Sequence, residues 1–141
     1  MEETKENKEE KQEVKEKKGL IGIANIYTSF NNTIIHITDM LGNTISQVRG
    51  GMVTKHDRLK ANPTIAMFSA KRAAEQARDA GITSVYVRIR AKTGAPSLGP
   101  GAHAAVKSLS REGLKIINIV DVTSVPRGGP KPKGGKRGRR V

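Results

Sequence analysis

The sequence predicts an α/β fold, a five-stranded mixed sheet with two helices in the order βββαβαβ. Three β-branched runs separated by turn residues fill the segment 19–48. Two segments with alanines at helical spacing follow, and each leads into a further strand-like run. Strands that alternate with helices indicate crossover connections, which are nearly always right-handed.

The first strand is expected over 21–28, where a mostly apolar run suits a central strand covered on both faces. Residues 29–32 form a turn, because asparagine tolerates a positive φ. β-Branched residues predict strands over 33–38 and 44–48, joined by a turn around Gly42. These three strands form an antiparallel meander.

The first helix follows a polar loop, 50–61, that is rich in glycine and cations. Asn62 is a helix cap, and Pro63 suits the first helical position. Alanines from Ala66 to Ala80 line one face, which allows close packing on a sheet, and Gly81 ends the helix.

The second helix lies between the last two predicted strands. Residues 83–90 alternate between apolar and polar side chains, as in a half-buried strand. A glycine- and proline-rich loop, 94–101, precedes a helix from about Pro100 to Glu112. The final strand is expected over 115–122.

The charge of the chain divides it into three parts. Residues 1–18 are a low-complexity Glu/Lys segment, expected to be a disordered extension. Residues 19–126 form the globular domain and carry thirteen Lys/Arg against six Asp/Glu. Residues 127–141 hold seven Lys/Arg among glycines and prolines, so this tail should be disordered alone. The net charge of +13 predicts a polyanionic partner.

The sequence lacks the residues that several classes of function require. The chain has no cysteine, its three histidines have no metal-ligand spacing, and the glycine-rich loop lacks a P-loop ending. Only Asp39 and Asp121 fall at strand ends, too few acids for a two-metal nuclease. We therefore expect no catalytic residue, cofactor, metal or small-molecule substrate. Without apolar anchors in the tail, we also expect no membrane partner.

The cations predict RNA binding, and each cluster has a plainer alternative. The loop cations either contact phosphate or are simply solvated, and the pair on the fourth strand either contacts phosphate or forms salt bridges. These candidates are Arg49, Lys55, His56, Arg58 and Lys60 in the loop, and Arg88 and Arg90 on the strand.

Two further loops contain candidate contacts. Phe30, beside Asn31 and Asn32, either stacks on a base or caps the core. The loop with Gly99 and Gly101 either presents a helix N-terminus to a phosphate or simply connects a strand to a helix.

The tail is expected to neutralise phosphates as it threads along nucleic acid. Its cations are Arg127, Lys131, Lys133, Lys136, Arg137, Arg139 and Arg140. The string GGKRGRR also resembles a minor-groove hook, which leaves a DNA- or chromatin-binding protein as the alternative. That string lacks the proline that closes such hooks.

Several strings resemble the universal small-subunit ribosomal protein S-eleven family, in its archaeal and eukaryotic branch. They are GIANIYTSFNNTIIHITDMLGNTIS (22–46), RGGMVTKHDR (49–58), GPGAHAAVKSLSREGLKI (99–116) and IVDVTSVP (119–126), before a basic tail. Bacterial members have Asn-Gly after the last strand, where this chain has Arg127-Gly128-Gly129.

The resemblance implies a three-layer α/β/α domain on the platform of the small subunit, in the cytoplasm. It implies binding to small-subunit ribosomal RNA near the messenger RNA exit path, beside neighbouring platform proteins. The segments expected against RNA are Asn31 and Asn32, Arg49 to Arg58, Gly99 to Gly101 and the tail from Arg127.

Overall fold

Five strands form one mixed sheet in the computed structural model, which describes residues 19–94 and 97–131. The strands are β1 (Leu20–Thr28), β2 (Thr33–Asp39), β3 (Thr44–Arg49), β4 (Ile82–Ala91) and β5 (Lys115–Asp121). Their order across the sheet is β3-β2-β1-β4-β5. Strands β1 to β3 pair antiparallel, whereas β4 is parallel to both β1 and β5. The predicted meander and the βββαβαβ order of the main elements are confirmed.

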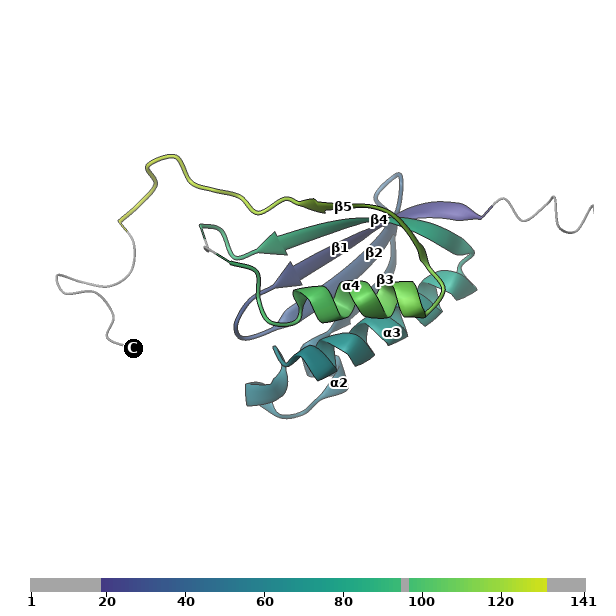
Figure 1. Ribbon diagram of the computed structural model, residues 1–141, viewed down its shortest axis with the longest axis horizontal. Coiled ribbons are helices and arrows are strands. Elements are labelled where there is room, and N and C mark those ends of the chain that lie inside the picture. Colours follow the sequence, from purple (N-terminus) through teal and green to yellow (C-terminus); the bar gives the residue numbers. More distant parts are fainter. Residues whose placement is uncertain (1–18, 95–96, 132–141) are drawn as a thin grey trace, which may run out of the picture.

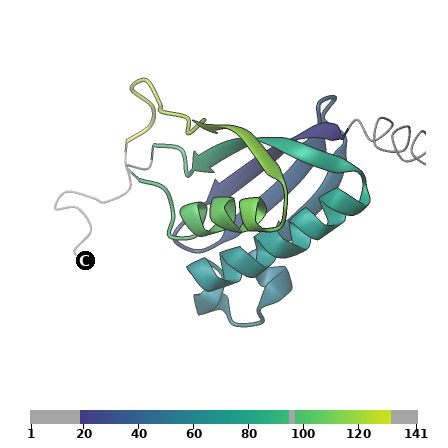
Figure 2. The same cartoon turned by 45° about the vertical axis from the view of Figure 1, so that its right-hand side comes forward.

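The two long helices lie side by side on the same face of the sheet (Figures 1 and 2). They are α3 (Pro63–Asp79) and α4 (Ala102–Arg111). The structure therefore has two layers where the family resemblance led us to expect three. Both crossovers, β3 to β4 and β4 to β5, step in the same direction across the sheet. Two right-handed crossovers that step in one direction place both helices on one face.

Helix α3 begins and ends as the sequence predicts. The side chain of Asn62 accepts a hydrogen bond from the Thr64 amide at 2.9 Å, and Pro63 occupies the first turn. The helix ends before Gly81, whose φ of +94° is strained for other residues. The loop before α3 contains two short elements that the sequence did not predict, α2 (Gly50–Val53) and the 3₁₀ helix η1 (Asp57–Leu59).

The core lies between the helices and one face of the sheet. The small side chains of α3 at positions 66, 69, 70, 73, 74 and 77 are buried, which lets the helix approach the strands closely. Strand β4 contributes Val85, Val87 and Ile89 to this core, and α4 contributes Leu109. Ala80, expected on the packed face, is exposed at the helix end.

The other face of the sheet has no covering layer in the described part of the chain. Along β1 the side chains alternate between buried and half-buried, and along β4 between buried and exposed. The expectation that the first strand is covered on both faces is therefore wrong. We call the uncovered side the open sheet face. It carries Ile23, Asn25, Tyr27, Ile34, His36, Gln47, Tyr86, Arg88 and Arg90.

Two buried glycines join the loop before α4 to the rest of the domain. A Cβ added at Gly99 would lie 2.7 Å from the carbonyl oxygen of Ser29, and one at Gly101 would lie 2.6 Å from Thr33 Oγ1. Glycine is required at both positions because the backbone approaches its neighbours too closely for a side chain.

We predict that Gly99→Ala destabilises the domain by about 1–3 kcal/mol, because the added methyl group meets backbone atoms that cannot move aside alone. Gly51→Ala is the matched control, since its Cβ would meet only the flexible end of Lys60. Thermal and urea denaturation of the full chain measure the effect. Equal stability of Gly99→Ala and the wild type would contradict this packing role.

Candidate nucleic-acid interface

Four connecting segments meet at one end of the domain (Figure 1). Strands β1, β3, β4 and β5 all run in the same direction, because β2 is antiparallel to both β1 and β3. The segments that follow their carboxyl ends therefore lie at the same edge of the sheet. These segments are 29–32, 49–60, 92–101 without 95–96, and 122–131. We call them together the basic end.

Direct contacts hold these segments together. The Gly99 amide donates to Thr28 Oγ1 at 3.1 Å, and the Gly94 amide donates to the Ser124 carbonyl at 3.0 Å. A Cβ added at Gly50 would lie 2.8 Å from Asn32 Oδ1. The basic end is therefore a packed structure, which fixes the positions from which its side chains reach solvent.

The turn between β1 and β2 exposes Phe30 and Asn31. Ser29 Oγ accepts hydrogen bonds from the amides of Asn31 and Asn32, at 3.3 and 3.1 Å. The side-chain oxygen of Asn32 is occupied by the Thr33 amide at 2.9 Å. Phe30 is 72% exposed. The alternative in which Phe30 caps the core is therefore wrong.

The cationic loop presents most of its charges to solvent. Arg49, Lys55, His56 and Arg58 are exposed. Lys60 instead forms a salt bridge with Asp57 at 2.7 Å. The hydrogen bond and the charge of Lys60 lower the pKa of Asp57 below its usual 3.8, so the ion pair persists to a lower pH than an isolated aspartate would allow.

The glycine-rich loops pack against other parts of the chain. Gly50 is buried against the Lys60 carbonyl, and the amides of Gly99 and Ala102 already donate to acceptors in the protein. The amides of Gly99 and Ala102 are therefore not available to a phosphate at the start of α4. RNA contact by Gly99 and Gly101 remains a prediction, although both residues are buried.

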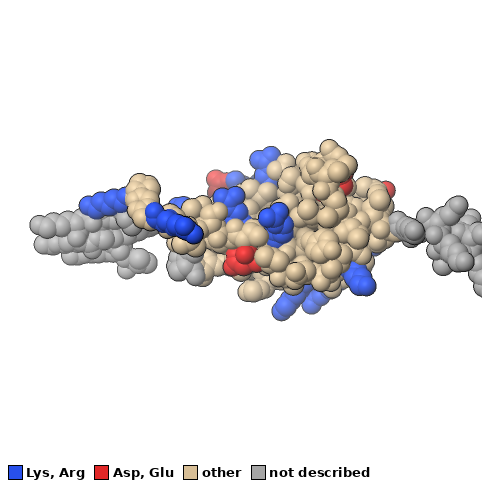
Figure 3. Space-filling view, turned by 90° about the horizontal axis from the view of Figure 1, so that it is seen from above, with Lys and Arg blue, Asp and Glu red and all other residues tan. Residues whose placement is uncertain are grey.

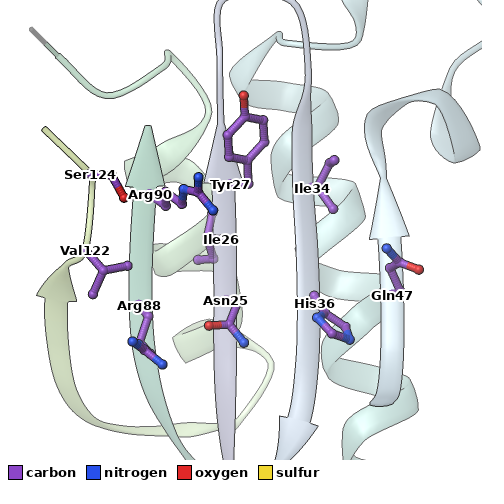
Figure 4. Close-up of a pocket in the computed structure, with 10 residues that line it drawn as sticks. All are labelled: Asn25, Ile26, Tyr27, Ile34, His36, Gln47, Arg88, Arg90, Val122 and Ser124. Carbon is purple, nitrogen blue, oxygen red and sulfur yellow. The ribbon is translucent and has the colours of Figure 1, made fainter. Parts of the chain in front are cut away.

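The two arginines of β4 lie on the open sheet face. Arg88 and Arg90 are exposed, and neither forms a salt bridge within the described residues. They line a hollow of about 460 Å³ (Figure 4). Its other polar lining residues are Asn25, Tyr27, His36, Gln47 and Ser124, and none of its ten lining residues is acidic.

Sequence reasoning missed the residues that surround these arginines. Asn25 is the register partner of Arg88, and Tyr27 is the partner of Arg90, on a strand far away in the sequence. The alternation along 21–28 was visible in the sequence. Which side chains surround Asn25 and Tyr27, however, depends on the strand that pairs with β1, and that pairing is a long-range contact.

The C-terminal segment leaves the domain from the same end. Arg127 and Lys131 are exposed. Figure 3 views the molecule from above the sheet and shows cations both on the body and out along this segment. The other predicted tail cations, Lys133, Lys136, Arg137, Arg139 and Arg140, lie outside the described residues.

The described residues contain neither a candidate metal site nor a candidate membrane-spanning helix. No three His, Cys, Asp or Glu side chains come together in a group that could hold a metal ion. None of the helices in that part of the chain is long and apolar enough to cross a membrane.

A two-layer domain with cations at one end and on an uncovered sheet face has the features of a nucleic-acid-binding protein. The family model described as Ribosomal protein S11 matches residues 22–137. This match spans more than half of the chain, so the chain belongs to the ribosomal protein S11 family. The family consists of structural proteins of the small ribosomal subunit that bind ribosomal RNA.

We predict that Asp57→Asn tightens binding to small-subunit ribosomal RNA by roughly two- to fivefold at low salt, the scale of one exposed ion pair. The substitution removes a negative charge from the basic end and frees Lys60 for phosphate. Fluorescence anisotropy with a labelled RNA fragment measures the change.

Asp79→Asn is the matched control, because it removes the same charge from the carboxyl end of α3, at the far end of that helix from the basic end. If both variants tighten binding equally, total charge explains the effect and the local salt bridge does not.

Proposed function

We propose that this protein stabilises folded ribosomal RNA on the platform of the small subunit, near the messenger RNA exit path. It acts as a structural component without catalysis, beside neighbouring platform proteins of the cytoplasmic ribosome. RNA is bound by phosphate contacts from the basic end and from Arg88 and Arg90, and by the tail 127–141, which orders as it binds.

The observation that carries this proposal is the scarcity of ion pairs around the cations. Among the described residues the salt bridges are Lys60 with Asp57 and Arg78 with Glu112. The remaining described Lys and Arg have no acidic partner among the residues that the structure describes, so their charges are available to phosphates. Placing these cations on a rigid sheet and its packed loops also costs little ordering entropy on binding.

The domain and the tail contribute in different ways. The domain offers cations at fixed positions, which suits recognition of a folded RNA by its shape. The tail neutralises phosphates and releases counterions, but it must become ordered as it binds. Affinity is therefore the balance between counterion release and the ordering cost of the tail.

The first test is a salt titration of the full chain on a small-subunit ribosomal RNA fragment. A random-sequence RNA and an A·T-rich DNA duplex of matched charge are measured beside it. We expect a preference for the ribosomal RNA that persists at physiological salt, because shape recognition does not scale with phosphate number alone. Equal binding to all three, weakening together as salt rises, would contradict the proposal. Tighter binding to the duplex would support the DNA-binding alternative.

We predict that deleting residues 127–141 weakens RNA binding and flattens its salt dependence. Loss of four or five phosphate contacts would reduce the log–log slope by roughly four on the duplex scale, and by somewhat less for single strands. Deleting residues 1–18 is the control, because that segment carries a net charge of −1. An unchanged slope after removal of 127–141 would exclude the tail from RNA binding.

A further inference from the structure

The open sheet face arranges side chains from four strands in two rows. One row, nearer the basic end, runs Arg90, Tyr27, Ile34 and Arg49 across β4, β1, β2 and β3. The next row runs Arg88, Asn25, His36 and Gln47 across the same strands. These eight side chains thus share one face, because register partners in a sheet point to the same side.

The two rows differ in chemistry. The first places an aromatic ring and an aliphatic side chain between two arginines. The second places an arginine beside two side-chain amides and an imidazole, whose Nε2 lies 2.8 Å from Thr44 Oγ1. Side-chain amides both donate and accept hydrogen bonds, so they can recognise the edge of a base. Figure 4 shows Arg88, Asn25 and His36 side by side on neighbouring strands, with Tyr27 and Arg90 nearer the strand ends.

We propose that this hollow binds one unpaired nucleotide of RNA. The base lies against Tyr27 and Ile34, its edge faces the amides of the second row, and its phosphate contacts Arg88 and Arg90. This inference rests on the proposed RNA-binding function. It adds that the open sheet face selects unpaired RNA over paired RNA.

The shape of the site favours an unpaired base over a duplex. The hollow of about 460 Å³ is within the range of roughly 300–1,000 Å³ that is typical of ligand sites. In an A-form duplex the ring faces are stacked on neighbouring base pairs and the major-groove edges lie in a deep, narrow groove, whereas an unpaired nucleotide presents both a ring face and its edges. Stacking on Tyr27 therefore requires a base that is free of its partner strand.

Charge also favours RNA as the occupant. None of the lining residues is acidic, and Arg88 and Arg90 have no ion pair within the described residues. The first row ends in Arg49, which belongs to the basic end. Cations therefore continue from the hollow to the edge of the sheet, where the neighbouring phosphates of an RNA chain can follow.

Tyrosine fluorescence provides a direct test, because the chain has two tyrosines and no tryptophan. In a full-length Tyr86→Phe variant the emission comes from Tyr27 alone. We expect an unstructured single-stranded RNA to quench this emission strongly, because the base stacks on the ring. A blunt-ended RNA duplex with the same number of phosphates should quench it little, because it offers no unpaired base.

The Tyr27→Phe variant is the matched control, because it keeps a ring in the hollow and leaves only Tyr86 to emit. It corrects for absorption of light by the RNA, and its emission should respond less than that of Tyr27, because Tyr86 lies on the open sheet face but does not line this hollow. Quenching of Tyr27 by the duplex as strongly as by the single strand would overturn the inference, and so would the absence of quenching by either RNA.

Affinity gives an independent measurement. Tyr27→Leu should weaken binding of the single-stranded RNA about tenfold, within the range for the loss of one base–aromatic stack, whereas Tyr27→Phe should retain it. Arg88→Gln with Arg90→Gln should also weaken it, whereas Lys71→Gln with Arg72→Gln, on the exposed face of α3, should weaken it less. Circular dichroism verifies that each variant is folded.

Ribosomal RNA binding by the wild type separates the two proposals. If the wild type prefers its ribosomal RNA while the Tyr27 variants bind the single-stranded RNA equally well, only the nucleotide site is wrong. If the wild type shows no preference for ribosomal RNA, the proposed function itself is wrong.

Discussion

The two crossover connections, β3–α3–β4 and β4–α4–β5, constrain the whole molecule because both step across the sheet in the same direction. Given the right-handedness of such connections, both helices must pack on one face, where the small side chains of α3 bury the core. The same geometry leaves the opposite face without a layer. It also brings the carboxyl ends of four strands to one edge, so the loops with the most cations become neighbours. The core and the candidate interface thus share one topological origin.

The excess of positive charge on this fold then determines the kind of partner that it binds. A domain with many unpaired cations repels itself, and a polyanion relieves that repulsion. The ion pair between Lys60 and Asp57 is an exception within the basic end, where the Asp57 carboxylate offsets the charge of one cation. The family assignment and the charge distribution agree, since ribosomal RNA is a polyanion.

Much of the fold could be predicted from the sequence, because its signals are local. The Asn62 cap, the stop at Gly81 and the alternation in 83–90 each depend on a few adjacent residues, and the structure confirms them. Glycines were harder to interpret. In 99–101 one interpretation of the sequence was a phosphate site at a helix N-terminus, whereas the structure shows that buried Gly99, like Gly50, allows the chain to approach itself. A glycine in the sequence indicates a close approach of the backbone, but it does not indicate whether the neighbour is a ligand or another part of the chain.

The sequence by itself determined the elements, their order, the excess of positive charge and the family resemblance, because periodicity, caps and composition are properties of short segments. Only the tertiary structure decided that the sheet has one uncovered face and that Tyr27 lies beside Arg90. Those facts depend on strand order and register, which are set by contacts between residues some sixty positions apart. No local pattern encodes which strand will become the neighbour of β1, and so the rows on the open sheet face appear only once the chain has folded.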